Sequence, residues 1–172
     1  MALGEIKENL AAAGGDPDTR KLLGSAQQNA KDTLTELRDL ARGIHPPVLD
    51  RGLAPALSTL ADTSPIPVDL TVDAAGRPSP AIEAIAYFCT AELLANAAKH
   101  SGTDTVTVSV RDRDAGPLLL TVSDDGAGGA RVVPGGGLAG LRERVQTVDG
   151  QLTVDSPAGG PTTVTIELPR HA

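Results

Sequence analysis

The chain has 172 residues, enough for one domain of ordinary size with an appendage, and a core of that size needs no disulfides. Its single cysteine, Cys89, cannot form an internal bridge, so nothing implies an oxidising compartment. The net charge of -7 argues against nucleic acid as a partner, because that binding depends on clustered Lys and Arg. The sequence has no run of about 18 apolar residues, and its first ten residues lack the apolar core of a signal peptide. We therefore expect a cytoplasmic chain without membrane contact, and a membrane anchor upstream in a longer parent protein stays open.

The first part of the chain has the apolar periodicity of helices. Apolar residues spaced three and four apart occupy positions 3–10, and the GGDPD segment that follows indicates a helix ended by glycines. A second seam with the same spacings runs from Leu23 to Ile44 and is typical of a helical hairpin or a dimeric bundle. Pro46 and Pro47 end this seam, because proline removes an amide donor and disfavours helix in the preceding residue.

These breaks divide the chain into three regions. We expect a partial helical hairpin over residues 1–45, a joint over 46–52 and a second domain over 53–172. The seam in residues 20–44 predicts a homodimer. A four-helix bundle needs both helices of each hairpin, and the first helix is short, so a monomer and a weak dimer both stay open.

Beyond the joint, helical segments interleave with alternating ones. Helices are predicted over 53–61, 79–100 and 137–150. Strands are predicted where apolar and polar residues alternate, over 68–73, 105–112, 118–124, 151–156 and 162–169. Helices interleaved with hairpins favour the α/β class, as a two-layer α/β sandwich in which helices cover one face of a mixed sheet.

A row of polar side chains lies on the last turns of the long predicted helix. Its members are spaced three and four apart and are expected to project from one stripe: Glu92, Asn96, Lys99 and His100. An asparagine oxygen suits a hard cation such as Mg2+ shared with substrate phosphates, and a carboxylate one turn earlier could orient a nucleophile. Taken singly, Lys99 also fits a solvated face, and His100 fits a helix end that favours a cation.

Two glycine-rich segments follow this helix. Asp124 ends an apolar strand before Gly126 and Gly128; its carboxylate can accept a hydrogen bond from an exocyclic amine such as that of adenine. The plain alternative is an Asp-Gly turn between strands. Glycines 135–137 precede Leu138 and a predicted helix, whose free amides would stabilise phosphate oxygens. The alternative there is a flexible loop capped by a helix, and the spacing is not that of a P-loop.

These segments resemble one known family. AELLANAAKHS, SDDGAGG and GGGLAGLRERV resemble the asparagine box and the two glycine boxes of the ATP-binding domain of bacterial two-component sensor histidine kinases. That domain has the Bergerat ATP-binding fold, which DNA gyrase and MutL share. LRDLARGIHPPVLDRGLAPAL resembles the segment that joins the dimerisation helices to the ATPase domain in the subfamily signalling to NarL-type regulators. The resemblance covers roughly residues 33–169 and rests on four separate motifs.

The resemblance implies a role for each matching residue. Asn96 would be the Mg2+ ligand, Glu92 the catalytic acid beside it, and Asp124 the contact to the adenine amine of ATP. Thr162 would lie near adenine. The other nucleotide-binding positions would lie on the phosphate side or shape the turns: Lys99, His100, Gly126, Gly128, Gly135, Gly137, Leu138 and Gly140.

The expected function is that of the catalytic region of a sensor histidine kinase. Such a kinase passes the γ-phosphoryl group of Mg-ATP to a histidine and then to an aspartate of a response regulator, here of the NarL type. The family's acceptor is a histidine followed at once by an acidic residue, and His45, His100 and His171 are not. We therefore expect this chain to bind ATP without phosphorylating itself at the usual site. Two alternatives stay open: a stand-alone serine kinase of the anti-sigma type, and a non-catalytic dimerisation or adaptor module with a nucleotide-binding fold.

Overall fold

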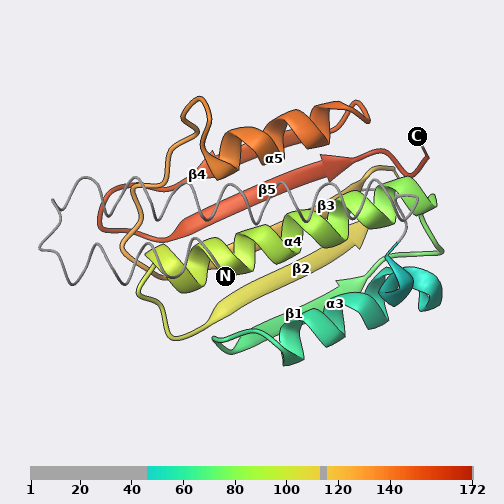
Figure 1. Cartoon of the computed structure of the whole chain (residues 1–172), viewed down its shortest axis with the longest axis horizontal. Helices are drawn as coiled ribbons and strands as arrows, with labels where there is room; N and C mark the ends of the chain where they lie inside the picture. Colours follow the sequence, from blue (N-terminus) through green and yellow to red (C-terminus); the bar gives the residue numbers. More distant parts are fainter. Residues whose placement is uncertain (1–45, 113–115, 172) are drawn as a thin grey trace, which may run out of the picture. The chain divides into compact units, whose positions relative to one another are not determined.

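The structure, a computed structural model, describes residues 46–112 and 116–171, which belong to one compact unit. Within these residues a five-stranded sheet forms one layer, and α-helices form a second layer on one of its faces (Figure 1). The predicted fold class, a two-layer α/β sandwich with a mixed sheet, is confirmed. The predicted helical hairpin over 1–45, with its dimer seam and His45, lies outside the described residues.

The pairing of the strands brings the end of β3 next to the start of β5. It consists of β1 (Val68–Asp73), β2 (Val106–Asp112), β3 (Leu118–Asp124), β4 (Gln151–Asp155) and β5 (Thr162–Leu168), in the order β1-β2-β3-β5-β4. β1 and β2 are parallel, and the other neighbours are antiparallel. Each strand begins and ends within one residue of its predicted bounds. Because β3 pairs with β5, Asp124 lies opposite Thr162.

Alternation along the strands separates the two faces of the sheet. The face toward the helices is built from buried aliphatic side chains: Val106, Val108, Val110, Leu118, Leu120, Val122, Val164, Ile166 and Leu168. The other face is rich in Ser and Thr, and the hydroxyls of Ser123 on β3 and Thr163 on β5 share a hydrogen bond of 2.8 Å. A slip of one residue would exchange the two faces, so the apolar alternation fixes the register.

The central helix is α4 (Pro80–His100), which lies between α3 (Leu53–Asp62) and α5 (Gly137–Gln146) in the helix layer (Figure 1). Pro80 begins α4, because proline has no amide that would need a partner in the first turn. The helix buries Ile82, Cys89 and Leu93 in the core. By length and composition α4 could also cross a membrane, but half of its apolar window is buried inside the domain, as in the core helix of a globular protein.

The helix α5 is shorter than predicted, because it ends at Gln146 instead of reaching Gly150. Asp149 adopts the left-handed conformation with a φ of 57°, and the amide of Gly150 donates to the Val145 carbonyl at 3.0 Å. A Cβ on Gly150 would lie 2.7 Å from the carbonyl oxygen of Glu167 on β5. The chain therefore turns before this glycine, which passes close to the neighbouring strand.

A short 3-10 helix, η1 (Pro47–Arg51), occupies the predicted joint and is tied to the domain through a buried carboxylate. Glu83 on α4 is fully buried and accepts two hydrogen bonds of 2.8 Å from Arg77 and one of 3.2 Å from the Leu53 amide. Arg77 also donates to the Leu49 carbonyl at 2.6 Å. The hydrogen bond to Glu83 raises the pKa of the Arg77 guanidinium above its ordinary value. The pair thus joins η1, α3 and α4.

Substitution of Glu83 by alanine should destabilise the domain by about 3 kcal/mol, the lower end of the cost of breaking a buried ion pair. The lower end applies because the Arg77 side chain, 51% exposed, regains water when its partner is lost. Urea unfolding followed by circular dichroism measures this change. Asp62→Ala, at an exposed acid on α3, is the control and should stay within about 0.5 kcal/mol of the original chain. Equal stability of the two variants would contradict a structural role for the pair.

Candidate functional site

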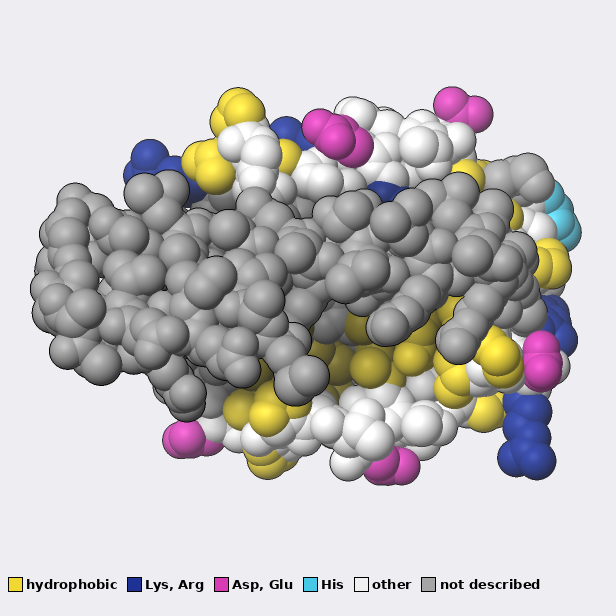
Figure 2. Space-filling model, viewed as in Figure 1, with side chains coloured by type: hydrophobic (Ala, Val, Ile, Leu, Met, Phe, Trp, Pro, Cys, Tyr) yellow, Lys and Arg dark blue, Asp and Glu magenta, His cyan; other side chains and the backbone are white. Residues whose placement is uncertain are grey.

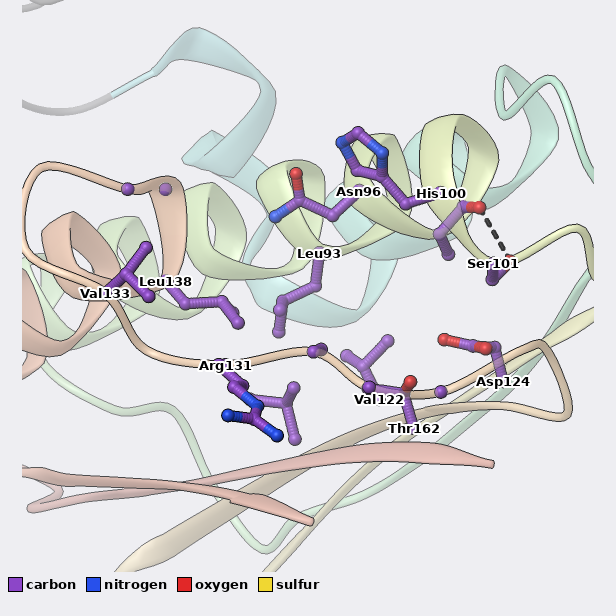
Figure 3. Close-up of a pocket in the computed structure, with 17 residues that line it drawn as sticks. Leu93, Asn96, His100, Ser101, Val122, Asp124, Arg131, Val133, Leu138 and Thr162 are labelled. Atoms are coloured by element: carbon purple, nitrogen blue, oxygen red, sulfur yellow. Dashed lines mark hydrogen bonds between the residues drawn. The ribbon is translucent and has the colours of Figure 1, made fainter. Parts of the chain in front are cut away.

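A cavity of about 350 Å³ lies between α4 and the segment that follows β3 (Figure 3). Its volume falls in the usual range of small-molecule sites, about 300–1,000 Å³. The walls come from α4, the end of β3 with the glycine turn, the start of α5 and the start of β5. Seven residues predicted from the sequence line this cavity: Asn96, His100, Asp124, Gly128, Gly137, Leu138 and Thr162.

One end of the cavity combines a carboxylate with apolar walls. Asp124 Oδ1 accepts the Gly126 amide at 2.9 Å, which orients the carboxylate and leaves it further lone pairs for a ligand. Val122 and Val164, paired across β3 and β5, line the cavity nearby, and Thr162 lies opposite Asp124. Such an end suits a flat ligand with an amine on its edge, because an ionised carboxylate only accepts hydrogen bonds.

At Gly126 and Gly128, the turn after Asp124 is packed too tightly for a side chain. A Cβ on Gly126 would lie 2.3 Å from the carbonyl oxygen of Ser101, the residue that follows α4, and the Ala127 amide donates to that same oxygen at 2.9 Å. A Cβ on Gly128 would lie 2.0 Å from the carbonyl oxygen of Pro157 in the β4–β5 turn. The turn is therefore held between α4 and the β4–β5 turn, which fixes Asp124 at the cavity wall.

The other end of the cavity lies where α4 meets the first turn of α5. In Figure 3, Asn96 points from α4 toward the cavity, and Leu93 and Leu138 approach each other from the two helices. A Cβ on Gly137 would lie 3.3 Å from Glu92 Oε1 and 3.8 Å from Asn96 Nδ2. Glu92 and Asn96 thus border the amino terminus of α5, whose free amides favour negative charge.

Lys99 departs from the expected polar stripe. It lines a second hollow, between α3 and α4, together with Leu60, Ala95 and Ala98, and Figure 2 shows the apolar side chains there. On an α-helix, positions three and four residues after Asn96 lie on opposite sides of it, about 100° apart. His100 therefore lines the cavity while Lys99 does not, and the predicted phosphate contact of Lys99 is not supported by this geometry.

Three predicted glycines and Glu92 do not line the cavity itself. Gly126 packs against Ser101 in the turn after Asp124. Gly135, with a φ of 75°, lies in the turn before α5, and Gly140 lies one turn into that helix on its exposed side. These glycines belong to the backbone that surrounds the cavity. The Glu92 side chain lies at the edge of the cavity, next to Gly137.

The sequence interpretation missed the residues between the two glycine segments. Ala130, Arg131 and Val133 all line the cavity, and Val133 is 53% exposed. Arg131 adds a cation to the wall, which would favour an anionic ligand. The only signal in the sequence was its position between the glycine segments, because no spacing rule connects it to the polar residues of α4.

Cys89 lies in the core on α4 and is fully buried. Burial raises the pKa of its thiol to about 12, with a smaller opposing effect from Arg144 and a smaller supporting one from Glu92. The thiol therefore stays protonated at neutral pH and packs as an apolar group, as predicted from its place on the apolar face of α4.

The sheet, its layer of helices and the glycine-bordered cavity match a known family of ATPase domains. Residues 83–172, just over half of the chain, match the family described as "Histidine kinase-, DNA gyrase B-, and HSP90-like ATPase", and the chain belongs to this family. Its relatives narrow the class to sensor histidine kinases, which confirms the resemblance to their ATP-binding catalytic domain.

Two of these relatives show the extent of the similarity. The chain is 33% identical over 178 aligned positions to the sensor histidine kinase NarS of Mycobacterium tuberculosis, covering 96% of this chain and 40% of that protein. It is 35% identical over 88 residues to the sensor histidine kinase YdfH of Bacillus subtilis (strain 168), covering 48% of this chain and 22% of that protein. The chain thus spans less than half the length of the curated relatives it matches.

The fold also matches a solved histidine kinase structure. The histidine kinase AdeS of Acinetobacter baumannii superposes with a TM-score of 0.53 at 15% sequence identity, covering 96% of this chain and 92% of that one. At this level of identity the match demonstrates the shared fold.

Proposed function

We propose that this chain is the ATP-binding catalytic region of a sensor histidine kinase and supplies the γ-phosphoryl group of ATP for transfer to a histidine. One observation carries the proposal: the same cavity has Asp124 and Thr162 at one end and Asn96 and the first turn of α5 at the other. The carboxylate end fits adenine, and the helix terminus fits phosphates. Membership of the ATPase family supports ATP as the nucleotide.

Each end of the cavity would act on a different part of ATP. Asp124 would accept a hydrogen bond from the adenine amine, with Val122 and Val164 against the face of the base. The amides at the start of α5 would bind the phosphate oxygens, Arg131 would add positive charge, and His100 would contact the phosphates through its imidazole ring. Glu92, beside Gly137, would orient the attacking group at the γ-phosphate. Catalysis in this arrangement consists mainly of positioning and charge stabilisation.

The cavity suits Mg2+ only as a partner of the nucleotide. The described residues contain no group of three or more His, Cys, Asp or Glu side chains that could hold a metal by itself. Mg2+ commonly takes one or two protein ligands and completes its shell with phosphate oxygens and water. Asn96 would provide the protein ligand, since its side chain borders the phosphate end. Bound there, the ion would neutralise phosphate charge.

Substitution of Asn96 by alanine should weaken Mg-ATP binding by about tenfold or more while changing metal-free ATP binding little, because the lost oxygen acts through the ion. Isothermal titration with and without Mg2+ measures both affinities. Lys99→Ala is the matched control from the same helical turn, and its affinity should equal that of the original chain. An equal loss of Mg-ATP and metal-free ATP binding in Asn96→Ala would contradict the metal role.

The later steps of the signalling reaction rest on the relatives. We propose transfer of the phosphoryl group to a histidine outside this chain and then to a NarL-type response regulator, in a cytoplasmic setting, with dimerisation through residues 20–44. Labelled ATP, incubated with this chain and with a separate dimerisation hairpin that carries an acceptor histidine, tests the first step. Acid-labile phosphate on the added hairpin supports it, whereas such phosphate on this chain alone would contradict the expectation that no acceptor histidine is present.

Labelled ATP with an added partner protein, together with an ATP-binding titration, separates the two alternative functions. Acid-stable phosphate on a serine of a partner protein would favour a serine kinase of the anti-sigma type. Absence of ATP binding would favour an adaptor module. The relatives named as sensor histidine kinases, together with the intact Glu92, Asn96 and Asp124, favour the histidine kinase.

A further inference from the structure

We term residues 129–136, the segment between the glycine turn and α5, the lid. The first residues of the lid are hydrogen-bonded to the β4–β5 turn. The Gly129 amide donates to the Ser156 carbonyl at 3.2 Å, and the Ala130 amide donates to Ser156 Oγ at 2.9 Å. The same Oγ shares a hydrogen bond of 2.9 Å with Thr162 Oγ1. Ser156 therefore contacts both the lid and a residue that lines the cavity, although it does not line the cavity itself.

The bond to Ser156 Oγ marks the end of the anchored part of the lid. Among the described residues, the next backbone hydrogen bond within the lid joins the Gly136 amide to the Val133 carbonyl at 3.0 Å, just before α5. Between these two points, Arg131 and Val133 line the cavity and are exposed to solvent. The hydroxyl of Ser156 thus lies where the fixed base of the lid passes into its exposed part.

A hydroxyl at position 156 is suited to joining these groups. It has one proton and two lone pairs, so Ser156 Oγ can accept the Ala130 amide and still pair with the Thr162 hydroxyl. A ligand that fixes Thr162 would therefore also fix the acceptor of the lid amide. No other side chain in the described residues bridges the lid and Thr162 in this way.

We propose that Ser156 is a positioning residue that couples the adenine-side wall of the cavity to the lid. Base binding at Thr162 and placement of the lid over the phosphates then support each other. The inference rests on the proposed function, since it takes ATP as the ligand of the cavity. It predicts that Ser156 matters most for ligands that reach both ends of the cavity.

Substitution of Ser156 by alanine tests this coupling through the ratio of two affinities. The variant should bind ATP about three- to tenfold more weakly, the effect of one lost hydrogen bond, and should bind adenosine with less than about twofold change. Ser156→Thr keeps the hydroxyl and should restore the original ratio. Ser123→Ala is the matched control, because it removes an equivalent hydroxyl pair, with Thr163, away from the lid. Equal losses for ATP and adenosine, or no loss for either, would overturn the proposal.

Hydrogen exchange measured by NMR in the nucleotide-free protein provides a second test that needs no ATP binding. Ser156→Ala should speed exchange of the Ala130 amide at least about threefold relative to both the original chain and Ser123→Ala. An unchanged exchange rate of the Ala130 amide would contradict the role of Ser156 in holding the lid. Failure of the original chain to bind ATP would instead contradict the proposed function. The exchange rates would still test the hydrogen bond between Ala130 and Ser156.

Discussion

Replacing Asp124 by asparagine is expected to weaken ATP binding by at least about tenfold and to leave the fold intact, a loss typical of a hydrogen bond to a charged group. The amide oxygen of asparagine can still accept the Gly126 amide, as Oδ1 does now at 2.9 Å. Its other end is then an NH2 donor, which would face the donating amine of adenine. The substitution should therefore weaken ATP binding without disturbing the turn. Isothermal titration with ATP measures the change in affinity.

The neighbouring acid offers a matched control for this substitution. Asp125 carries the same charge one residue later, is exposed, and does not line the cavity. Asp125→Asn should therefore bind ATP within about twofold of the original chain, since surface charges act weakly. If both variants lost affinity equally, the effect would come from net charge, and the adenine role of Asp124 would be wrong.

Replacing Gly128 by alanine should be the most damaging single methyl addition in the domain. The added Cβ would lie 2.0 Å from the Pro157 carbonyl oxygen and 2.4 Å from that of Gly160, and φ at this position is 61°. Both obstacles are backbone atoms, so relief requires the β4–β5 turn to move. We expect a loss of more than about 4 kcal/mol in the free energy of unfolding, together with loss of ATP binding. Urea unfolding and ATP titration measure the two effects.

The adjacent glycine separates steric conflict from backbone strain. Gly129 also has a positive φ, 78°, but a Cβ there would meet nothing within 4 Å. Gly129→Ala should therefore cost only the left-handed strain of about 1–2 kcal/mol. Equal destabilisation by the two substitutions would show that the close packing of Gly128 against the β4–β5 turn is not what requires glycine.

The strands could be predicted because apolar and polar residues alternate strictly along them. Alternation of Val106, Val108 and Val110 with polar residues leaves one arrangement that buries one face of β2. The end of α5 could not be predicted in this way, because it depends on the passage of Gly150 close to Glu167, a contact between distant parts of the chain. The ion pair of the buried Glu83 with the half-exposed Arg77 was also missed, since its partners include the backbone of the joint.

The candidate site was predicted where motifs carry its residues and missed where only the fold brings them together. Asn96 and Asp124 stand in recognisable motifs, and the structure places both at one cavity. Lys99 stands in the same motif, yet the direction of the helix turns it toward α3. Ser156 and Arg131 belong to no motif that we recognised, and their proximity to the cavity follows from the β4–β5 turn and the path of the lid.

Titration of the chain with Mg-ATP and Mg-GTP is the most direct test of adenine recognition in this cavity. We expect saturable binding of one ATP per chain, and at least about tenfold weaker binding of GTP, because guanine presents a carbonyl oxygen where adenine presents an amine to Asp124. Absence of ATP binding, or equal affinity for the two nucleotides, would contradict the assignment of this cavity as an ATP site.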